Sequence, residues 1–179
     1  ESIKDINLRN IKKRNKFAII YRNSKKNENN LDLFKFRMIC KSKLIKFFVA
    51  NDLSQAVRLK RDGVYISAKN KNIRYLNFHK KNFYTIGGAH NIKGINLKKK
   101  QGCKYIFLSR LFKVSYKPSM SFLGVNKFNN YILKSSIKTI PLGGINGFNL
   151  NKLKLVRSDG LAIFSEIKKK PANIINRLF

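Results

Sequence analysis

The sequence predicts an α/β fold of the (β/α)8 TIM-barrel type, built on parallel strands. Short apolar runs recur along the chain without alternating polar positions, as in strands that are buried on both faces. Stretches of helical periodicity lie between these runs, which follow one another roughly every twenty residues and so indicate repeated βα units. Regular one-to-one alternation favours a closed barrel over an open sheet.

The predicted strands are short segments rich in β-branched and aromatic residues. We count seven, whereas a barrel of this type has eight. Ile3, Ile6 and Ile11 lie at helical spacing and predict a helix before the first of these segments. We therefore expect the barrel's first strand to be absent from this chain: either it lies upstream or the barrel is incomplete. The seven segments are residues 17–21, 44–50, 63–67, 83–89, 104–109, 139–144 and 160–164.

Helices are predicted between these strands from capping residues and apolar spacing. Residues 52–63 begin at Asp52 or Ser54 as the N-cap, with apolar residues free to face inward from the first turn onward. The same criteria predict helices over residues 91–102, 147–160 and 171–179.

Length and composition set the class of protein. A chain of 179 residues with 43% apolar residues suits one compact domain, spanning residues 1–179. No apolar run approaches the roughly 18 residues that cross a bilayer, and no secretory signal is visible, so we expect a cytoplasmic protein without a membrane partner. Cys40 and Cys103 lack metal-ligand spacing.

The net charge of +32 would attract any polyanion, including nucleic acid, anionic lipid or a phosphorylated metabolite. The basic residues are spread along the chain, and neither a zinc pattern nor an aromatic-basic RNA motif accompanies them. Nucleic acid therefore stays open as an alternative partner, and the charge has no explanation in the sequence.

Phosphate-binding residue types follow several predicted strands. The active site of a parallel barrel forms at the carboxyl ends of its strands, and a phosphate site after the last two strands is common. Three cations that can hold phosphate follow two of the strands, and backbone N–H groups near a glycine pair can cradle a further phosphate. For the cations the alternative is a solvated surface, and for the glycines a plain turn. The residues are Arg22, Lys25, Lys117, Gly143, Gly144 and Ser165.

Six short motifs follow one another along residues 17–167: "YRNSKK", "VANDLSQAVRLKRDGVYI", "IGGAHN", "LSRLFKVSYKP", "IPLGGI" and "SDGLAIFSEI". In this order they resemble the family of thiamine phosphate synthase and its paralogue, the thiazole tautomerase TenI. Each motif alone is weak, and their common order is what makes the resemblance specific for the family. The family's members are (β/α)8 barrels.

The resemblance implies roles for most of these residues. In the synthase, a pyrimidine diphosphate loses pyrophosphate and the thiazole nitrogen bonds to its methylene carbon, with Mg²⁺ and cations steadying the leaving group. Asp52 would ligate Mg²⁺, which is expected only if synthase activity is retained. The pyrimidine and its pyrophosphate would be bound by Arg22, Lys25, Asn51 and Lys117, and the thiazole phosphate by Gly143, Gly144 and Ser165.

Several positions depart from the family's pattern. Its second metal-binding aspartate falls at Asn70, a poorer ligand for a hard cation, and its preceding glutamine at Ala68. A family serine falls at Gly88, and two threonines of the pyrophosphate loop fall at Val114 and Tyr116. These changes argue against an efficient synthase.

The tautomerase branch tolerates these changes better, since its reaction moves a proton on a carboxythiazole phosphate without a metal. His90 matches the branch's histidine and suits proton transfer at neutral pH, although it can equally be a structural, hydrogen-bonded histidine. Lys117 is the second candidate catalytic residue.

We therefore expect a thiamine biosynthesis protein of this family, diverged or TenI-like, that acts as a transferase or an isomerase. Its ligands would be a thiazole phosphate and a pyrimidine diphosphate, bound at the carboxyl-end mouth of the barrel. The alternative is a non-catalytic protein that binds a phosphorylated ligand or nucleic acid on a barrel scaffold. The sequence leaves the oligomeric state open.

Overall fold

A computed structural model of the chain describes residues 3, 8, 16–22, 28–60, 62–77, 83–116, 118–158 and 160–163. Six strands form one sheet in chain order, and each neighbouring pair is parallel. The strands are β1 (Ala18–Tyr21), β2 (Lys46–Ala50), β3 (Gly63–Ile66), β4 (Tyr84–Ala89), β5 (Tyr105–Ser109) and β6 (Lys138–Leu142).

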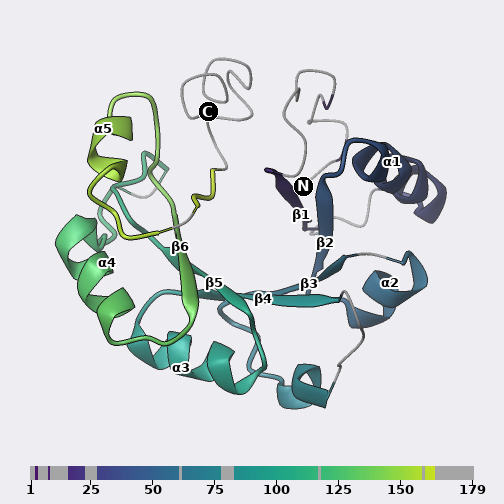
Figure 1. Ribbon diagram of the computed structural model, residues 1–179, viewed down its shortest axis with the longest axis horizontal. Coiled ribbons are helices and arrows are strands. Elements are labelled where there is room, and N and C mark those ends of the chain that lie inside the picture. Colours follow the sequence, from purple (N-terminus) through teal and green to yellow (C-terminus); the bar gives the residue numbers. More distant parts are fainter. Residues whose placement is uncertain are drawn as a thin grey trace.

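The sheet curves into a half-barrel that is open between its edge strands β1 and β6, with the helices on its outer side (Figure 1). No helix in the described ranges is long and apolar enough to cross a membrane. The helices are α1 (Asn30–Ser42), α2 (Leu53–Arg58), the 3-10 helix η3 (Ile73–Asn77), α3 (Ile92–Lys100), α4 (Gly124–Leu133) and α5 (Leu150–Leu153).

The predicted parallel α/β class is confirmed, whereas the described residues do not make a closed eight-stranded barrel. Six of the seven predicted strands are in the sheet. The seventh contributes a single parallel bridge, between Ala162 and Leu142, and its last residue lies outside the described residues. The predicted helices at residues 1–15 and 171–179 also fall outside them, apart from isolated positions.

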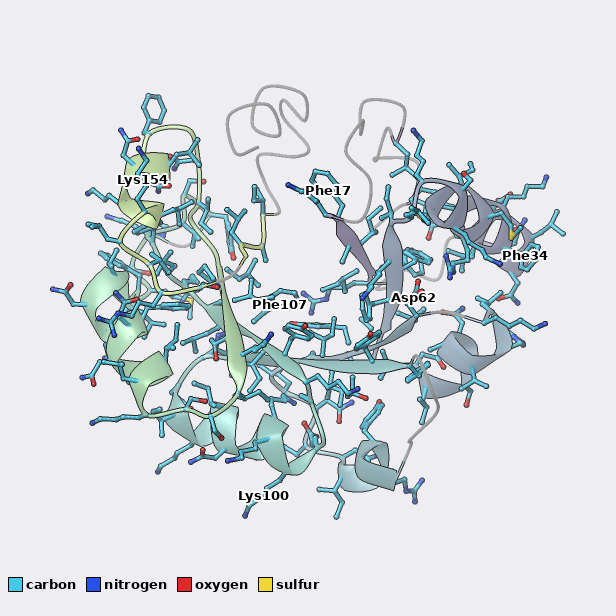
Figure 2. All side chains as sticks on the ribbon, in the orientation of Figure 1. Phe17, Phe34, Asp62, Lys100, Phe107 and Lys154 are labelled. Carbon is cyan, nitrogen blue, oxygen red and sulfur yellow. The ribbon has the colours of Figure 1, made fainter. Side chains whose placement is uncertain are left out.

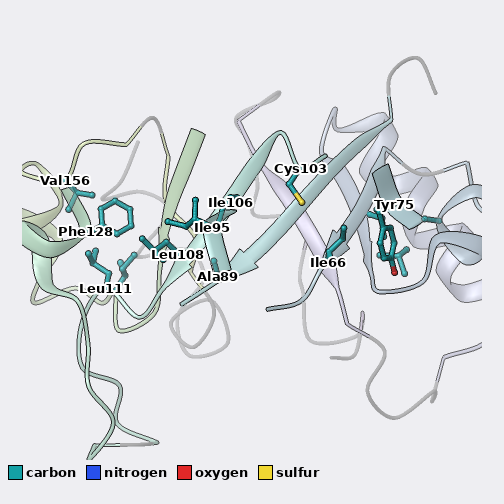
Figure 3. Packing of buried hydrophobic residues seen from close by; sticks show 14 residues of the cluster. Ile66, Tyr75, Ala89, Ile95, Cys103, Ile106, Leu108, Leu111, Phe128 and Val156 are labelled. Carbon is teal, nitrogen blue, oxygen red and sulfur yellow. The ribbon is translucent and has the colours of Figure 1, made fainter. Parts of the chain in front are cut away.

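Both faces of the sheet are buried, which explains why the strands do not alternate in sequence. Val64, Ile66, Ile106 and Leu108 point outward and belong to the large core beneath the helices (Figure 3). The intervening residues point into the concave side, where Phe107 is seen (Figure 2), and form a second cluster. That inner cluster is built on Phe48, Tyr65, Ile86 and Phe107.

Capping residues set where two of the predicted helices begin. Of the two candidates at the start of α2, Asp52 is the N-cap, because its carboxylate accepts a hydrogen bond from Gln55 N at 2.7 Å. Asn91 caps α3 in the same way through Gly94 N, at 2.8 Å. The chain leaves α3 through Gly102, whose φ of 74° suits glycine.

The sequence analysis missed α1 and α4. Helix α1 carries its buried residues Leu33, Phe36 and Cys40 at helical spacing, so a signal was present in the sequence. Its cap, Asn29, accepts a hydrogen bond from Asp32 N at 2.8 Å. Helix α4 has no side-chain cap, but its apolar residues Val125, Phe128 and Ile132 also lie at helical spacing and pack in the large core. Helix α5 is shorter than the segment predicted for it.

Candidate active site

The carboxyl ends of β1 to β6 meet at one end of the half-barrel, because all the strands are parallel. This carboxyl end receives most of the residues that the sequence analysis singled out, directly after their strands. Three of them, Lys25, Lys117 and Ser165, lie outside the described residues. The remaining candidates are Arg22, Asn51, Asp52, His90, Gly143 and Gly144.

Asn51 and Asn70 lie together and join the loops that follow β2 and β3. Asn51 Oδ1 accepts hydrogen bonds from Ser67 N at 2.9 Å and from Asn70 Nδ2 at 3.3 Å. The Tyr75 hydroxyl donates to the carbonyl oxygen of Asn51 at 3.1 Å. Asn51 has a φ of 59°, a left-handed conformation that asparagine tolerates better than most residues. These contacts hold the loop ends, so the Asn51 side-chain oxygen is already occupied.

Asp52 and Asn70 do not form a good magnesium site. One carboxylate oxygen of Asp52 caps α2, and Asn70 Oδ1 accepts a hydrogen bond from Asn72 N at 2.9 Å. Asn70 Nδ2, which repels a cation, faces Asn51. The part of the chain that the structure describes contains no cluster of three or more His, Cys, Asp or Glu side chains suited to a metal ion. One carboxylate beside an occupied amide does not fit a dedicated Mg²⁺ site.

Lys98, on α3, holds the loop that follows β3 through hydrogen bonds. Its side chain is fully buried, and Nζ donates to Asn70 O and to Gln101 Oε1, both at 2.7 Å. Gln101 Nε2 adds hydrogen bonds to Asn70 O and Asn72 O. Burial lowers the pKa of Lys98, with a smaller opposing effect of the nearby Cys103 thiol. Nothing in the run of three lysines at residues 98–100 indicated that the first of them points inward.

His90 follows β4 and contacts the last residue of β5. Its Nδ1 lies 2.9 Å from the carbonyl oxygen of Ser109 and 3.0 Å from Ser109 Oγ. A carbonyl oxygen can only accept, so this contact places the proton of the neutral imidazole on Nδ1. The other ring nitrogen, Nε2, is then unprotonated and able to accept a proton. The exposed His90 side chain is thus held at the end of β5 by hydrogen bonding to Ser109.

The glycine pair after β6 is needed for close packing. Gly143 and Gly144 have φ values of 96° and 72°, and a Cβ on Gly144 would lie 2.5 Å from the carbonyl oxygens of Phe112 and Lys113. Within the described residues, the backbone N–H groups of Gly143, Gly144 and Ile145 donate to no other group. The turn therefore has a structural reason for its glycines and three N–H donors that an anion can use.

Arg110, which the sequence analysis passed over, lies against this glycine pair. Its Cγ would be 3.1 Å from a Cβ on Gly143, and its buried Nε has no hydrogen-bond partner in the described structure. The guanidinium donates to the Met120 thioether at 3.2 Å and to Ser121 O at a long 3.4 Å. A thioether is a weak acceptor for a charged donor, so Arg110 retains capacity for an anion. Its place directly after β5 was the signal available in the sequence.

Tyr65 explains one departure from the family's pattern. The Tyr65 hydroxyl occupies the space in which a side chain at Gly88 would place its Cβ. Burial raises the pKa of Tyr65, whereas the positive charge of Arg22 lowers it by a smaller amount. The Arg22 guanidinium carbon lies 5.9 Å from the Tyr65 ring centroid, close enough for a cation–π contact. A glycine at 88 thus accommodates a large neighbour on the inner face.

Comparisons with known proteins agree with one another. A family model described as thiamine monophosphate synthase matches residues 8–167. The thiamine-phosphate synthase of Prochlorococcus marinus strain SARG is 31% identical over 133 residues, which cover 72% of this chain and 38% of that protein. The thiamine-phosphate synthase of Clostridioides difficile strain 630 is 30% identical over 139 residues, 75% of this chain and 65% of that protein. The chain thus spans less than two thirds of these relatives.

A similar fold is present in a solved structure. The thiamine phosphate pyrophosphorylase from Pyrococcus furiosus superposes with a TM-score of 0.69 over 89% of this chain and 81% of that one, at 18% identity. A structure titled native KDPGal superposes with a TM-score of 0.61 at 12% identity. At these identities the superpositions establish the fold alone.

Proposed function

The chain belongs to the thiamine monophosphate synthase family, and from that premise we propose that its carboxyl-end site binds a phosphorylated thiazole and moves a proton on it. The proposed activity is thus an isomerase of the tautomerase type, with a role in thiamine biosynthesis. The observation that carries the proposal is the succession of His90, Ser109, Arg110 and Gly143 along the ends of β4, β5 and β6.

The phosphate would lie at the glycine pair. The N–H groups of Gly143, Gly144 and Ile145 and the guanidinium of Arg110 offer donors from two neighbouring strand ends. Charge-assisted bonds from arginine to a phosphate are stronger than the contacts that Arg110 makes with Met120 and Ser121. Ser165 completes the phosphate site in our proposal, as the family resemblance implies.

His90 would transfer the proton. Its Nδ1–H is held by the Ser109 carbonyl, so Nε2 accepts a proton from one atom of the bound thiazole and returns it to another. The imidazolium formed in between is stabilised by the same carbonyl and needs no other base. Lys117 remains a candidate to stabilise negative charge that develops on the ligand.

Synthase activity is the second candidate, and the names of the relatives favour it. It would use Arg22, Lys25, Asn51 and Lys117 for a pyrimidine diphosphate. The side-chain oxygen of Asn51 is occupied by Ser67 and Asn70, and Asp52 and Asn70 do not fit a dedicated magnesium site. For these reasons we rank the synthase below the tautomerase and derive no step through Mg²⁺. A cytoplasmic location goes with either activity.

Two assays of the full chain decide between these candidates. The first follows isomerisation of a carboxythiazole phosphate by the wild type, by His90→Gln, and by His79→Gln, which changes the chain's only other histidine. We expect His90→Gln to lower kcat by about a hundredfold or more and His79→Gln to leave it unchanged. The second supplies a pyrimidine diphosphate and a thiazole phosphate with and without Mg²⁺.

Each outcome of these two assays leads to a different conclusion about the function. Mg²⁺-dependent coupling of the two substrates, with no isomerisation, would replace our proposal by the synthase. Binding of the thiazole phosphate without turnover in either assay would make the protein a non-catalytic binder. Arg110→Gln separates binding from chemistry, since we expect it to raise KM about tenfold and to leave kcat near the wild-type value.

A further inference from the structure

We propose a second anion-binding site, at the amino end of β6, that takes a phosphate monoester of nucleotide size. A pocket of about 490 Å³ lies there, lined by the start of β6, the serine turn before it and the segment that follows α5. Lys138 is the first residue of β6, whereas the candidate active site follows the last one. The two sites are therefore at opposite ends of the same strands, and this inference does not depend on the proposed function.

Two cations from separate segments line the pocket. Lys138 comes from β6 and Arg157 from the segment after α5, and no acidic residue is among the described residues that line it. A third cation, Lys99 on α3, donates through Nζ to Ser136 Oγ at 2.8 Å. The Lys138 ammonium lies 5.9 Å from the ring centroid of Tyr105, which also lines the pocket. Lys138 and Arg157 thus bring two positive charges to the lining of one pocket, and a bound phosphate would neutralise them.

Two serine hydroxyls add neutral donors. Ser135 Oγ accepts a hydrogen bond from Ile137 N at 3.3 Å, and Ser136 Oγ accepts the one from Lys99. A hydroxyl that accepts keeps its own proton, and neither hydroxyl donates to a group in the described part of the chain. Ser158 differs, since its hydroxyl lies 2.9 Å from the carbonyl oxygens of Thr139 and Gly160 and is already used. The pocket thus offers two cations and two free O–H donors, which suits the oxygens of a phosphate.

The apolar and aromatic side chains that line the pocket suit the organic group attached to the phosphate. Ile132, Ile137 and Ile140 contribute apolar surface, and Tyr105 contributes an aromatic ring. A volume of about 490 Å³ is in the range of small-molecule sites. A positive surface without a pocket would bind any polyanion, whereas cations and hydroxyls that line one pocket together with apolar side chains favour a single small ligand. We therefore assign the site to a nucleoside monophosphate, and not to a nucleic acid.

The test measures binding of adenosine monophosphate to the full chain by isothermal titration calorimetry at about 0.15 M ionic strength, where long-range attraction is screened. We expect Arg157→Gln and Lys138→Gln each to weaken binding about tenfold or more. The matched controls Lys134→Gln and Lys154→Gln remove the same charge from exposed positions outside the pocket, and we expect less than about a twofold effect.

A variant that preserves the charge makes the test independent of the protein's overall field. Ser136→Ala removes one hydroxyl donor, and we expect it to weaken binding about threefold to tenfold while circular dichroism stays unchanged. Equal losses from the pocket variants and the controls would overturn the proposal in favour of general charge attraction. Loss from Arg110→Gln alone would place the ligand at the carboxyl end, and tighter binding of an RNA oligonucleotide that ignores Ser136 would show a nucleic-acid surface instead.

Discussion

The two ends of the half-barrel use their polar side chains differently. At the carboxyl end the side chains that follow the strands are hydrogen-bonded across loops, as Asn70 is to Asn51 and His90 is to Ser109. Their geometry is fixed by neighbours before any ligand arrives. The loops at the carboxyl end are therefore held together by specific donors and acceptors, among them the fully buried Lys98, which donates to Asn70 O.

At the amino end the cations contact aromatic rings. Lys46 and Lys104 lie 4.3 Å and 5.0 Å from the ring centroid of Tyr84, and Lys138 lies over Tyr105. Such contacts are weak at exposed positions and leave the ammonium groups able to meet an anion. In a protein with a net charge of +32, the position of a lysine alone does not mark a site. What marks a site is the set of groups that each cation contacts. Substitutions at the two ends should therefore lower the free energy of unfolding by different amounts.

The largest effect is expected for Gly144→Ala. The new Cβ would meet the carbonyl oxygens of Phe112 and Lys113 at 2.5 Å, in a residue whose φ is 72°. Urea denaturation should show a loss of about 3 kcal/mol in the free energy of unfolding. At Gly160 a Cβ meets nothing within 4 Å, so Gly160→Ala is the matched control with no loss. Equal stabilities would mean that the carboxyl end is not tightly packed.

The next effect is expected for Lys98→Met, which keeps the volume of the side chain and removes its ammonium. Asn70 O and Gln101 Oε1 would each lose a buried hydrogen bond, at a cost of about 2 kcal/mol by urea denaturation. Lys100→Met, on the exposed side of α3, should change the stability by less than about 0.5 kcal/mol. If both substitutions lower the free energy of unfolding equally, Lys98 does not stabilise the loop after β3.

Asn70→Asp tests whether this position is a metal ligand that has merely lost its charge. The carboxylate would lose the two donated bonds, to Asn51 Oδ1 and the Tyr75 hydroxyl, and would place two acceptors face to face. We expect a loss of about 1–2 kcal/mol that Mg²⁺ does not restore. Asn96→Asp, exposed on α3, controls for the added charge. Stabilisation of the Asn70 variant by millimolar Mg²⁺ would contradict this account.

Cys103, which lies two residues before β5 begins, supplies a prediction about how stability depends on pH. Burial raises the pKa of its thiol to about 12, against an ordinary value of 9.0, and Lys98 opposes this shift. Between these values the unfolded chain releases a proton that the folded chain keeps, so stability falls as pH rises above about 9. Relative to Cys103→Ala, the wild type should therefore lose free energy of unfolding between pH 9 and 10.5. Parallel stability curves for the two proteins would contradict the burial argument.

The smallest effect is expected at the amino end, for Tyr84→Leu. This change keeps an apolar side chain and removes the ring beneath Lys46 and Lys104, at a cost of about 0.5–1 kcal/mol by urea denaturation. Tyr116, which is exposed, serves as the control through Tyr116→Leu. If Tyr84→Leu lowered the stability as much as Lys98→Met, the expected difference between the two ends would be wrong.

The sequence by itself determined the strands and the family. Both faces of the sheet are buried, so apolar runs such as residues 104–109 are visible without any partner, and the order of the strand-end motifs identifies the family. It also named Asp52 as one of two candidate caps for α2, because a cap depends on residues three positions apart, and the structure chose Asp52 over Ser54. Helices α1 and α4 were missed, and the periodicity of α1 shows that the signal was there to use.

Only the tertiary structure decided how the site is assembled. The contacts of His90 with Ser109, of Asn70 with Asn51 and of Arg110 with Gly143 join residues on different strands and loops. Lys98 looks like any other lysine in a basic stretch until α3 packs on β4 and turns it inward. The periodicity of a segment shows which face of its helix or strand is apolar. The partner of each polar group depends instead on strand register and sheet curvature, which are properties of the whole chain.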